Sequence, residues 1–224
     1  MPPKAGTVPT AGVLVVSLRE GGLPGIGVRE LVDRFDYVPF RARGSQRHLE
    51  FAKVDGEYRL ALPVGTRRGS FLVGFTTEPR FVRVERASGR YTNVLVQHHA
   101  KLALRVHRGA FEPVEASPAV AARFGWRLEI VPLTDPLTLG VGDLLIARVR
   151  FGNGLAGCEV VAERLAPAGS EVAFRGLTGV HGHVEIPVRA TGLWRLRARH
   201  EVPAIATRPA ELHCATLVFR MGER

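Results

Sequence analysis

A regular alternation of apolar and polar residues is the feature that most constrains how this chain can fold. At positions 145–151 one set of alternate residues is apolar and the other set is mostly basic: Leu145, Ala147, Val149 and Phe151 against Ile146, Arg148 and Arg150. Successive side chains of a β-strand point to opposite sides, so the pattern predicts a strand with one buried face. Turn residues such as Gly152-Asn153-Gly154 follow it directly.

The same kind of pattern recurs through the C-terminal half of the chain. It predicts strands at residues 128–131, 145–151, 158–165, 172–174, 184–188, 193–200 and 212–220. About seven short strands within roughly a hundred residues are typical of an immunoglobulin-like β-sandwich. In the strand at 193–200, Trp194, Leu196 and Ala198 are expected to point inward. Arg195, Arg197 and Arg199 are expected to form an outward stripe.

The N-terminal half is also predicted to be β-rich, although its pattern is less regular. Strands are expected at residues 12–18, 28–40, 49–53, 58–62, 70–75 and 81–84, and Asp55-Gly56 favours a hairpin turn. Residues 90–106 fit either a helix or a strand. We therefore predict an all-β chain, with an N-terminal sandwich-like domain at 1–106, a linker at 107–125 and a C-terminal sandwich at 126–224. Residues 1–22 are expected to be a flexible lead into the first strand.

The charge of the chain is strongly basic. It has 31 Lys and Arg against 21 Asp and Glu, for a net charge of +10. Such a charge favours acidic partners or an acidic surface, although genomic base composition explains an arginine excess equally well. Only 7% of residues are aromatic, which argues against a nucleic-acid platform. No apolar run approaches the ~20 residues that a transmembrane helix needs.

The two cysteines, Cys158 and Cys214, leave two alternatives open. Both fall in predicted strands of the sandwich. A disulfide across the core is one alternative if the compartment is oxidising, and two buried thiols are the other. Spacing in the sequence does not decide between them.

Several segments in a fixed order carry a resemblance to a known family. They are LEIVPLTDP from position 128, NGLAGCEV from 153, GLWRLRARH from 192 and ATLVF from 215, with FLVGFTTEPRFVRV at 71–84 as a looser match. Together they resemble the bacterial family of uncharacterised periplasmic proteins named as components of nickel or cobalt uptake. The resemblance implies a periplasmic or otherwise extracytoplasmic binding protein whose ligand is nickel or cobalt.

Two departures from that family concern its metal chemistry. Members begin their mature chain with a histidine, whereas the first histidine here is His48. The turn that reads Thr-Asp-x-Asp-Gly in relatives stands here as Thr178-Gly179-Val180-His181-Gly182. The metal ligands that the sequence itself offers are His181 and His183, which an extended strand would place on one face, completed by His200 and His213.

No catalytic arrangement is evident in the sequence. The serines show no nucleophile-elbow pattern, and the acidic residues Glu129, Asp135 and Asp143 lie at turns, where capping is their ordinary role. Two hypotheses follow for a non-catalytic protein. It is a metal-handling accessory of nickel or cobalt uptake, or a structural subunit that docks onto a membrane transporter or other envelope complex through five arginines: Arg148, Arg150, Arg195, Arg197 and Arg199.

Overall fold

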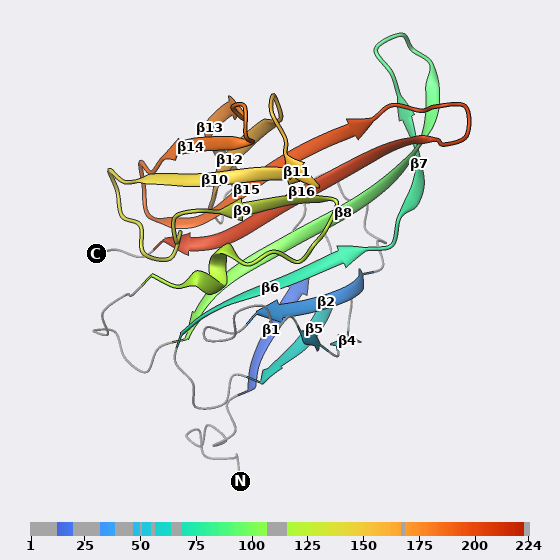
Figure 1. Ribbon diagram of the computed structural model, residues 1–224. Coiled ribbons are helices and arrows are strands. Elements are labelled where there is room, and N and C mark those ends of the chain that lie inside the picture. The colour runs from blue at the N-terminus through green and yellow to red at the C-terminus, as the bar shows by residue number, and fades with distance from the viewer. Residues whose placement is uncertain are drawn as a thin grey trace.

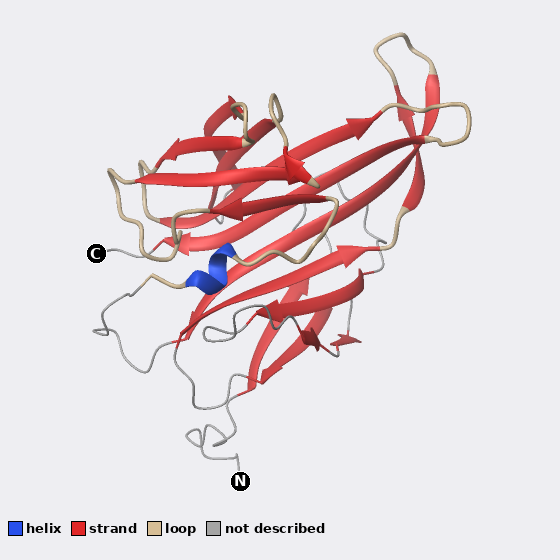
Figure 2. Ribbon diagram, viewed as in Figure 1, coloured by secondary structure: helices blue, strands red, loops and turns tan. Residues whose placement is uncertain are grey.

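The computed structural model of the protein describes residues 13–19, 32–38, 47–49, 51–54, 57–63, 69–106, 116–166 and 169–221. Most of these residues lie in strands, and their one helical element is the short 3-10 helix η1 (Pro118–Ala121). The predicted all-β class is therefore confirmed (Figure 2). No helix in this part of the chain is long and apolar enough to cross a membrane.

The large sheet has nine strands and takes them from both halves of the chain (Figure 1). Its order is β13 (Gly169–Leu177), β12 (Glu159–Ala166), β15 (Gly192–Val202), β16 (Ala210–Met221), β8 (Tyr91–Val106), β6 (Gly69–Thr77), β2 (Val32–Val38) and β3 (Arg47–Leu49), with β7 (Arg80–Glu85) also pairing with β8. Strands β16 and β8 run parallel, and the other pairs are antiparallel.

Two smaller sheets accompany the large one. The small sheet consists of β9 (Leu128–Pro132), β10 (Leu144–Phe151), β14 (His183–Pro187) and the short β11 (Asn153–Gly154). It lies over the large sheet at the end formed by the C-terminal strands (Figure 1). The third sheet has the order β1 (Val13–Arg19), β5 (Glu57–Pro63) and β4 (Phe51–Val54).

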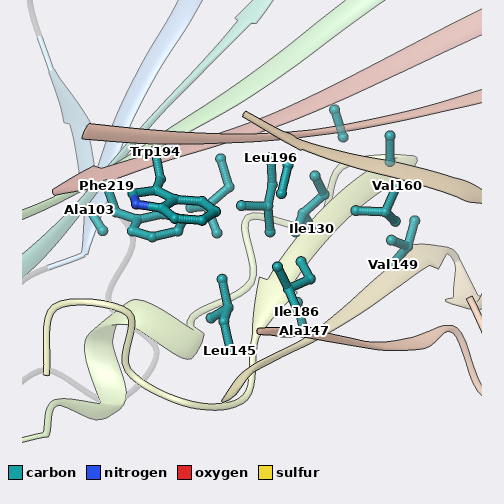
Figure 3. Close-up of a cluster of buried hydrophobic side chains, with 14 of the residues drawn as sticks. Ala103, Ile130, Leu145, Ala147, Val149, Val160, Ile186, Trp194, Leu196 and Phe219 are labelled. Atoms are coloured by element: carbon teal, nitrogen blue, oxygen red, sulfur yellow. The ribbon is translucent and has the colours of Figure 1, made fainter. Parts of the chain in front are cut away.

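The main core lies between the small sheet and the large sheet (Figure 3). The small sheet contributes Leu145, Ala147 and Val149, which are fully buried on alternate positions of β10. The large sheet contributes alternate residues of β12, β15 and β16, including the buried Trp194 and Phe219. Burial of each large apolar side chain contributes about 1.5–3 kcal/mol, so this face-to-face packing holds the two sheets together.

Residues 116–127 extend the cover over the same face of the large sheet. Ala119, Val120 and Phe124 are buried in one cluster with Leu72 and Ala103 of β6 and β8. We call the face that the small sheet and this segment cover the inner face of the large sheet. The core is therefore continuous from the strands of the C-terminal half into β6 and β8.

Gly74 is needed where this segment approaches β6. A Cβ atom at Gly74 would lie 2.6 Å from the ring of Trp126 and 2.9 Å from that of Phe124. Those two rings stack with centroids 4.8 Å apart, and Trp126 stacks on His99 with centroids 5.1 Å apart. Because Gly74 has no side chain, the rings of Phe124 and Trp126 can pack directly against strand β6.

The strands expected from the sequence are present, and the open alternative at residues 90–106 resolves as strand β8. Residues 55–56, where a hairpin turn is predicted, lie outside the described residues, but β4 and β5 pair with Val54 opposite Glu57. The large sheet draws strands from both sides of residues 107–125, and the described part of that segment packs on the sheet. The division into two domains at 107–125 stays a prediction.

Candidate functional site

The predicted histidine ligands His181 and His183 lie at a tight turn and the strand that follows it. Gly182 adopts a φ of 77° between them, and His183 begins β14 while His181 precedes the strand. Their ring centroids are 6.5 Å apart with the rings edge to face. The Nε of Arg148 donates to Nε2 of His183 at 2.7 Å, so the lone pair on that nitrogen is already engaged.

His200 and His213 form a second pair, on the inner face of the large sheet. They are directly opposite each other on β15 and β16. The ring of Phe151, at the end of β10, lies 4.6 Å from the ring of His200 and 5.2 Å from that of His213 between centroids. Alternation places both histidines on the same side as Trp194 and Leu217, which are in the core.

The two pairs do not come together. His183 pairs with Arg148 across β14 and β10, on alternate positions to the core residues Ala147 and Val184. The side chains of His183 and Arg148 therefore face away from the core, whereas those of His200 and His213 lie on the core side of the large sheet. Among the residues that the structure describes, no group of three or more His, Cys, Asp or Glu side chains is arranged to hold a metal ion. Metal binding stays a prediction.

Glu211 fixes the orientation of the His213 ring. Its Oε2 lies 3.0 Å from Nε2 of His213, and Arg127 and Arg208 approach the same carboxylate at 2.5 Å and 3.6 Å. These contacts hold the pKa of Glu211 below its usual range, with the hydrogen bond from His213 as the largest cause. Because a carboxylate only accepts hydrogen bonds, Nε2 of His213 carries the proton.

The other nitrogen of His213 is consequently a bare acceptor. Burial lowers the pKa of His213 in spite of Glu211, which keeps the ring neutral at physiological pH. Its Nδ1 is buried and has no hydrogen-bond partner among the described residues. The arrangement of a carboxylate on one ring nitrogen and an open lone pair on the other is the usual setting of a metal-ligating histidine.

His99 is a third imidazole on the inner face, and sequence reasoning missed it. It is expected from the sequence at an exposed segment end beside His98, but it lies in the middle of β8 and is 4% exposed. Its Nδ1 contacts the hydroxyl of Thr76 at 2.8 Å, and its Nε2 is buried without a partner in the described structure. Burial lowers the pKa of His99 to about 3. The one available signal was its place in an apolar strand.

The predicted outward arginine stripe on β15 is wrong at Arg195. This side chain is 3% exposed and is bound to Glu163, with Nε to Oε2 at 2.8 Å. Arg197 binds the other oxygen of the same carboxylate at 2.6 Å, and Arg199 is exposed. The error arises because alternation reports which residues share a face. It does not report that this second face is buried at Arg195, beside Glu163 of β12.

The two predicted arginines of β10 are partly buried on the outer side of the small sheet. Arg148 is bound to His183, and an Nη of Arg150 donates to the carbonyl of Gly152 at 3.0 Å. Docking through the five predicted arginines stays a prediction, with Arg199 the most exposed of them.

The acidic residues that were expected to cap turns divide into two groups. Asp135 accepts the backbone N–H groups of Ser117 and Leu137, and Asp143 accepts that of Gly140, so capping is confirmed for both. Glu129 instead forms an ion pair with Lys101 at 2.6 Å in the core, with each side chain 1% exposed. Its assignment to a turn was wrong, because β9 packs against β8 at this point.

Both cysteines are buried thiols. Cys158 belongs to the core on the inner face, whereas Cys214 alternates with the core residue Ala215 and points to the opposite face. A sheet separates the two side chains, so the alternative of a disulfide across the core is not realised. Burial raises the pKa of the Cys158 thiol, whose sulfur donates to the carbonyl of Arg199 at 3.3 Å.

Comparison with known proteins gives a family but no described activity. No curated protein was found to match the chain. A model of the family described as a domain of unknown function (DUF4198) matches residues 30–202, which span most of the chain. The match includes the small sheet and the strands of the large sheet other than β16. The chain therefore belongs to the DUF4198 family.

Proposed function

We propose that this protein is a non-catalytic binding protein of the extracytoplasmic space that handles nickel or cobalt as an accessory of metal uptake. We further propose that His200 and His213 contact the ion. The location and the link to uptake rest on the resemblance of residues 125–220 to the periplasmic family described above. The contact residues rest on geometry.

The observation that carries the proposal is the orientation of His213 by Glu211. The carboxylate holds Nε2–H, which leaves the Nδ1 lone pair buried and without a partner in the described part of the chain. His200 lies directly opposite on the neighbouring strand, where Cβ atoms are ~5 Å apart, so its imidazole reaches the same space. Neutral imidazole is a preferred ligand of nickel and cobalt.

Two protein ligands would leave most coordination positions to water. Such a site binds weakly and exchanges readily, which suits a protein that passes an ion on to a transporter. The ring of Phe151 packs against both imidazoles, so its movement would widen the access of an ion to them. Burial raises the pKa of the Cys158 thiol, so this side chain offers little nucleophilic reactivity.

Calorimetric titration with Ni²⁺ and with Co²⁺ tests this proposal. The variants are His200→Asn with His213→Gln, and as a matched control His181→Asn with His183→Gln, each checked by thermal unfolding. Binding heat is expected in the unmodified protein and in the control, and is expected to be lost in the first double variant. Absence of heat in the unmodified protein, or its persistence in the first variant, contradicts the proposal.

A third variant tests access to the histidine pair. Phe151→Ala removes the ring that covers the imidazoles, so we expect faster association of Ni²⁺ in stopped-flow measurements with His200 and His213 unchanged. An association rate equal to that of the unmodified protein would show that the ion does not approach past Phe151.

A further inference from the structure

The hairpin of β7 and β8 carries large apolar side chains on its solvent-exposed face. Phe81 is 63% exposed and Tyr91 is 54% exposed. Phe81 lies opposite Leu95 across the two strands, on the same face as Tyr91. An exposed strand face is normally polar, so these side chains provide apolar surface that a partner could contact.

The opposite face of the same hairpin is packed in a small hydrophobic cluster. Val94 and Val96 are buried there in a cluster with Ala210, and Val82 and Val84 pack against it. The burial of β7 alternates strictly, with Phe81, Arg83 and Glu85 exposed and the residues between them half-buried. The hairpin therefore has one face that stabilises the fold and one that remains open.

Strand β7 is also an edge of the large sheet. Its one partner among the described strands is β8, so no described strand pairs with its other side. An exposed edge of this kind pairs readily with an added extended chain, whose backbone supplies hydrogen bonds and whose alternate side chains supply specificity. The alternation of exposed side chains along β7 matches that mode of recognition.

The charge around the hairpin indicates which chain would fit. Residues 78–91 contain four arginines and two glutamates, within a chain of net charge +10. The guanidinium of Arg83 stacks on the ring of Tyr91, 4.4 Å from its centroid, which fixes a cation on the open face. Arg90 is also exposed at the end of the hairpin. Arg86 is already paired with Glu201, and Glu85 on the open face accepts a hydrogen bond from the hydroxyl of Tyr91. The face therefore presents Arg83 and Arg90 beside apolar surface.

We propose that an extended acidic segment of another protein adds as a strand to the free edge of β7. Its apolar side chains contact Phe81 and Leu95, and its carboxylates contact Arg83 and Arg90. A lipid surface offers the same negative charge, but it has no backbone to pair with the strand edge and no two-residue repeat. The observations therefore favour a peptide. This inference does not depend on metal binding.

Binding of a labelled ten-residue peptide of alternating Val and Asp, followed by fluorescence anisotropy, tests the inference. Three probes accompany it: a Val and Lys peptide, a Val and Asp peptide with two central prolines, and phosphatidylglycerol vesicles. We expect saturable binding of the Val and Asp peptide that weakens with added salt. Neither the Lys peptide nor the proline peptide is expected to bind, because the first has the wrong charge and the second cannot complete a ladder.

Two variants of the hairpin and one control locate the contact. Phe81→Ser and Arg83→Glu are each expected to weaken peptide binding at least about tenfold, which corresponds to about 1.4 kcal/mol. Arg175 is an exposed arginine on β13, another edge strand of the large sheet. The Arg175→Glu variant is expected to bind the peptide like the unmodified protein.

Four results would overturn the inference. They are no peptide binding up to about 1 mM, the limit of weak but specific contacts; equal binding of the proline peptide; unchanged affinity in both hairpin variants; and binding of the vesicles alone. The last result would assign the surface to a membrane.

Discussion

Lys101 and Glu129 hold opposite charges deep in the core, where each side chain is 1% exposed. Burial lowers the pKa of Lys101, while the nearby carboxylate partly restores it. Lys101 also donates to the carbonyl of Ala122, and Glu129 accepts the backbone N–H of Phe124 at 2.6 Å. The pair therefore ties β8 and β9 to the segment that covers β6.

Removal of one partner should cost far more than removal of both. Lys101→Met leaves the buried carboxylate of Glu129 without its cation, and Glu129→Gln leaves the buried ammonium of Lys101 without its anion. We expect either variant to lower the free energy of unfolding by about 3–5 kcal/mol. The double variant Lys101→Met with Glu129→Met should recover most of that loss. Urea unfolding measures all three. Single variants within about 0.5 kcal/mol of the unmodified protein would show that the pair is solvated.

Burial of His99 is expected to make the free energy of unfolding fall as the pH is lowered. Its pKa is about 3 in the folded protein, against 6.5 for an ordinary histidine, because of its burial and the nearby His213 and His98. Between those values the unfolded chain binds a proton that the folded chain excludes, so stability falls as the pH drops below about 6.5. This one group contributes a slope of at most about 1.4 kcal/mol per pH unit.

The variant His99→Phe removes that titration and should flatten the dependence of unfolding free energy on pH between 6.5 and 4. His98, with a pKa lowered to about 4, titrates in the same direction and remains as a smaller contribution. Urea unfolding at a series of pH values gives the slope directly. An unchanged slope in the variant would mean that His99 is solvated and charges in the folded protein.

At the scale of the elements, β12 and β15 are joined by a buried charged cluster as well as by their ladder. Glu163 and Arg195 are cross-strand partners, and Arg197 completes the cluster on the same carboxylate. Sequence alternation placed these arginines correctly on one face of β15. It could not show that Glu163 of β12 neutralises two of them, because strand register is a property of the folded sheet.

Glu163→Gln tests whether this cluster stabilises the pairing. The change leaves the buried Arg195 without its carboxylate, and we expect a loss of about 3–5 kcal/mol in the free energy of unfolding. The matched control is Glu171→Gln, which breaks the exposed pair with Arg164 on β13 and β12 and should cost less than about 1 kcal/mol. Similar losses in both variants, measured by urea unfolding, would contradict the difference in burial.

Strand β6 has a comparable dependence on one small residue. Gly74→Ala pushes a methyl group into Trp126 and Phe124, so we expect a loss of about 1–3 kcal/mol from overpacking. Gly179→Ala is the control, since a Cβ there would meet only the carbonyl of His183 at 3.8 Å. Thermal unfolding compares the two. A neutral Gly74→Ala would indicate that residues 124–126 move away from the sheet without cost.

At the scale of the whole molecule, the strands were predictable and their partners were not. Period-two alternation depends on local burial, which is why the strands from β9 to β16 could be found by pattern, apart from the two-residue β11, which was predicted as a turn. The parallel pairing of β16 with β8 joins residues more than a hundred positions apart, and no local pattern encodes it. The ion pair of Lys101 on β8 with Glu129 on β9 likewise joins segments that no local pattern relates.

The candidate site was predictable to the same limited degree. His200 and His213 could be proposed from their residue type, but their juxtaposition follows from the register of β15 and β16. The sequence could not show that His183 differs from them, because its hydrogen bond with Arg148 forms between the neighbouring strands β10 and β14. The proposed metal site therefore rests on the register that places His200 opposite His213 on the inner face of the large sheet.

Histidine side-chain NMR during titration with Ni²⁺ tests whether His200 and His213 bind the ion, because paramagnetic broadening identifies the nearest imidazoles. We expect the ring signals of His200 and His213 to broaden first, with His181 and His183 unaffected at the same metal concentration. Earlier broadening of His181 and His183, or the absence of selective broadening at any histidine, would contradict it.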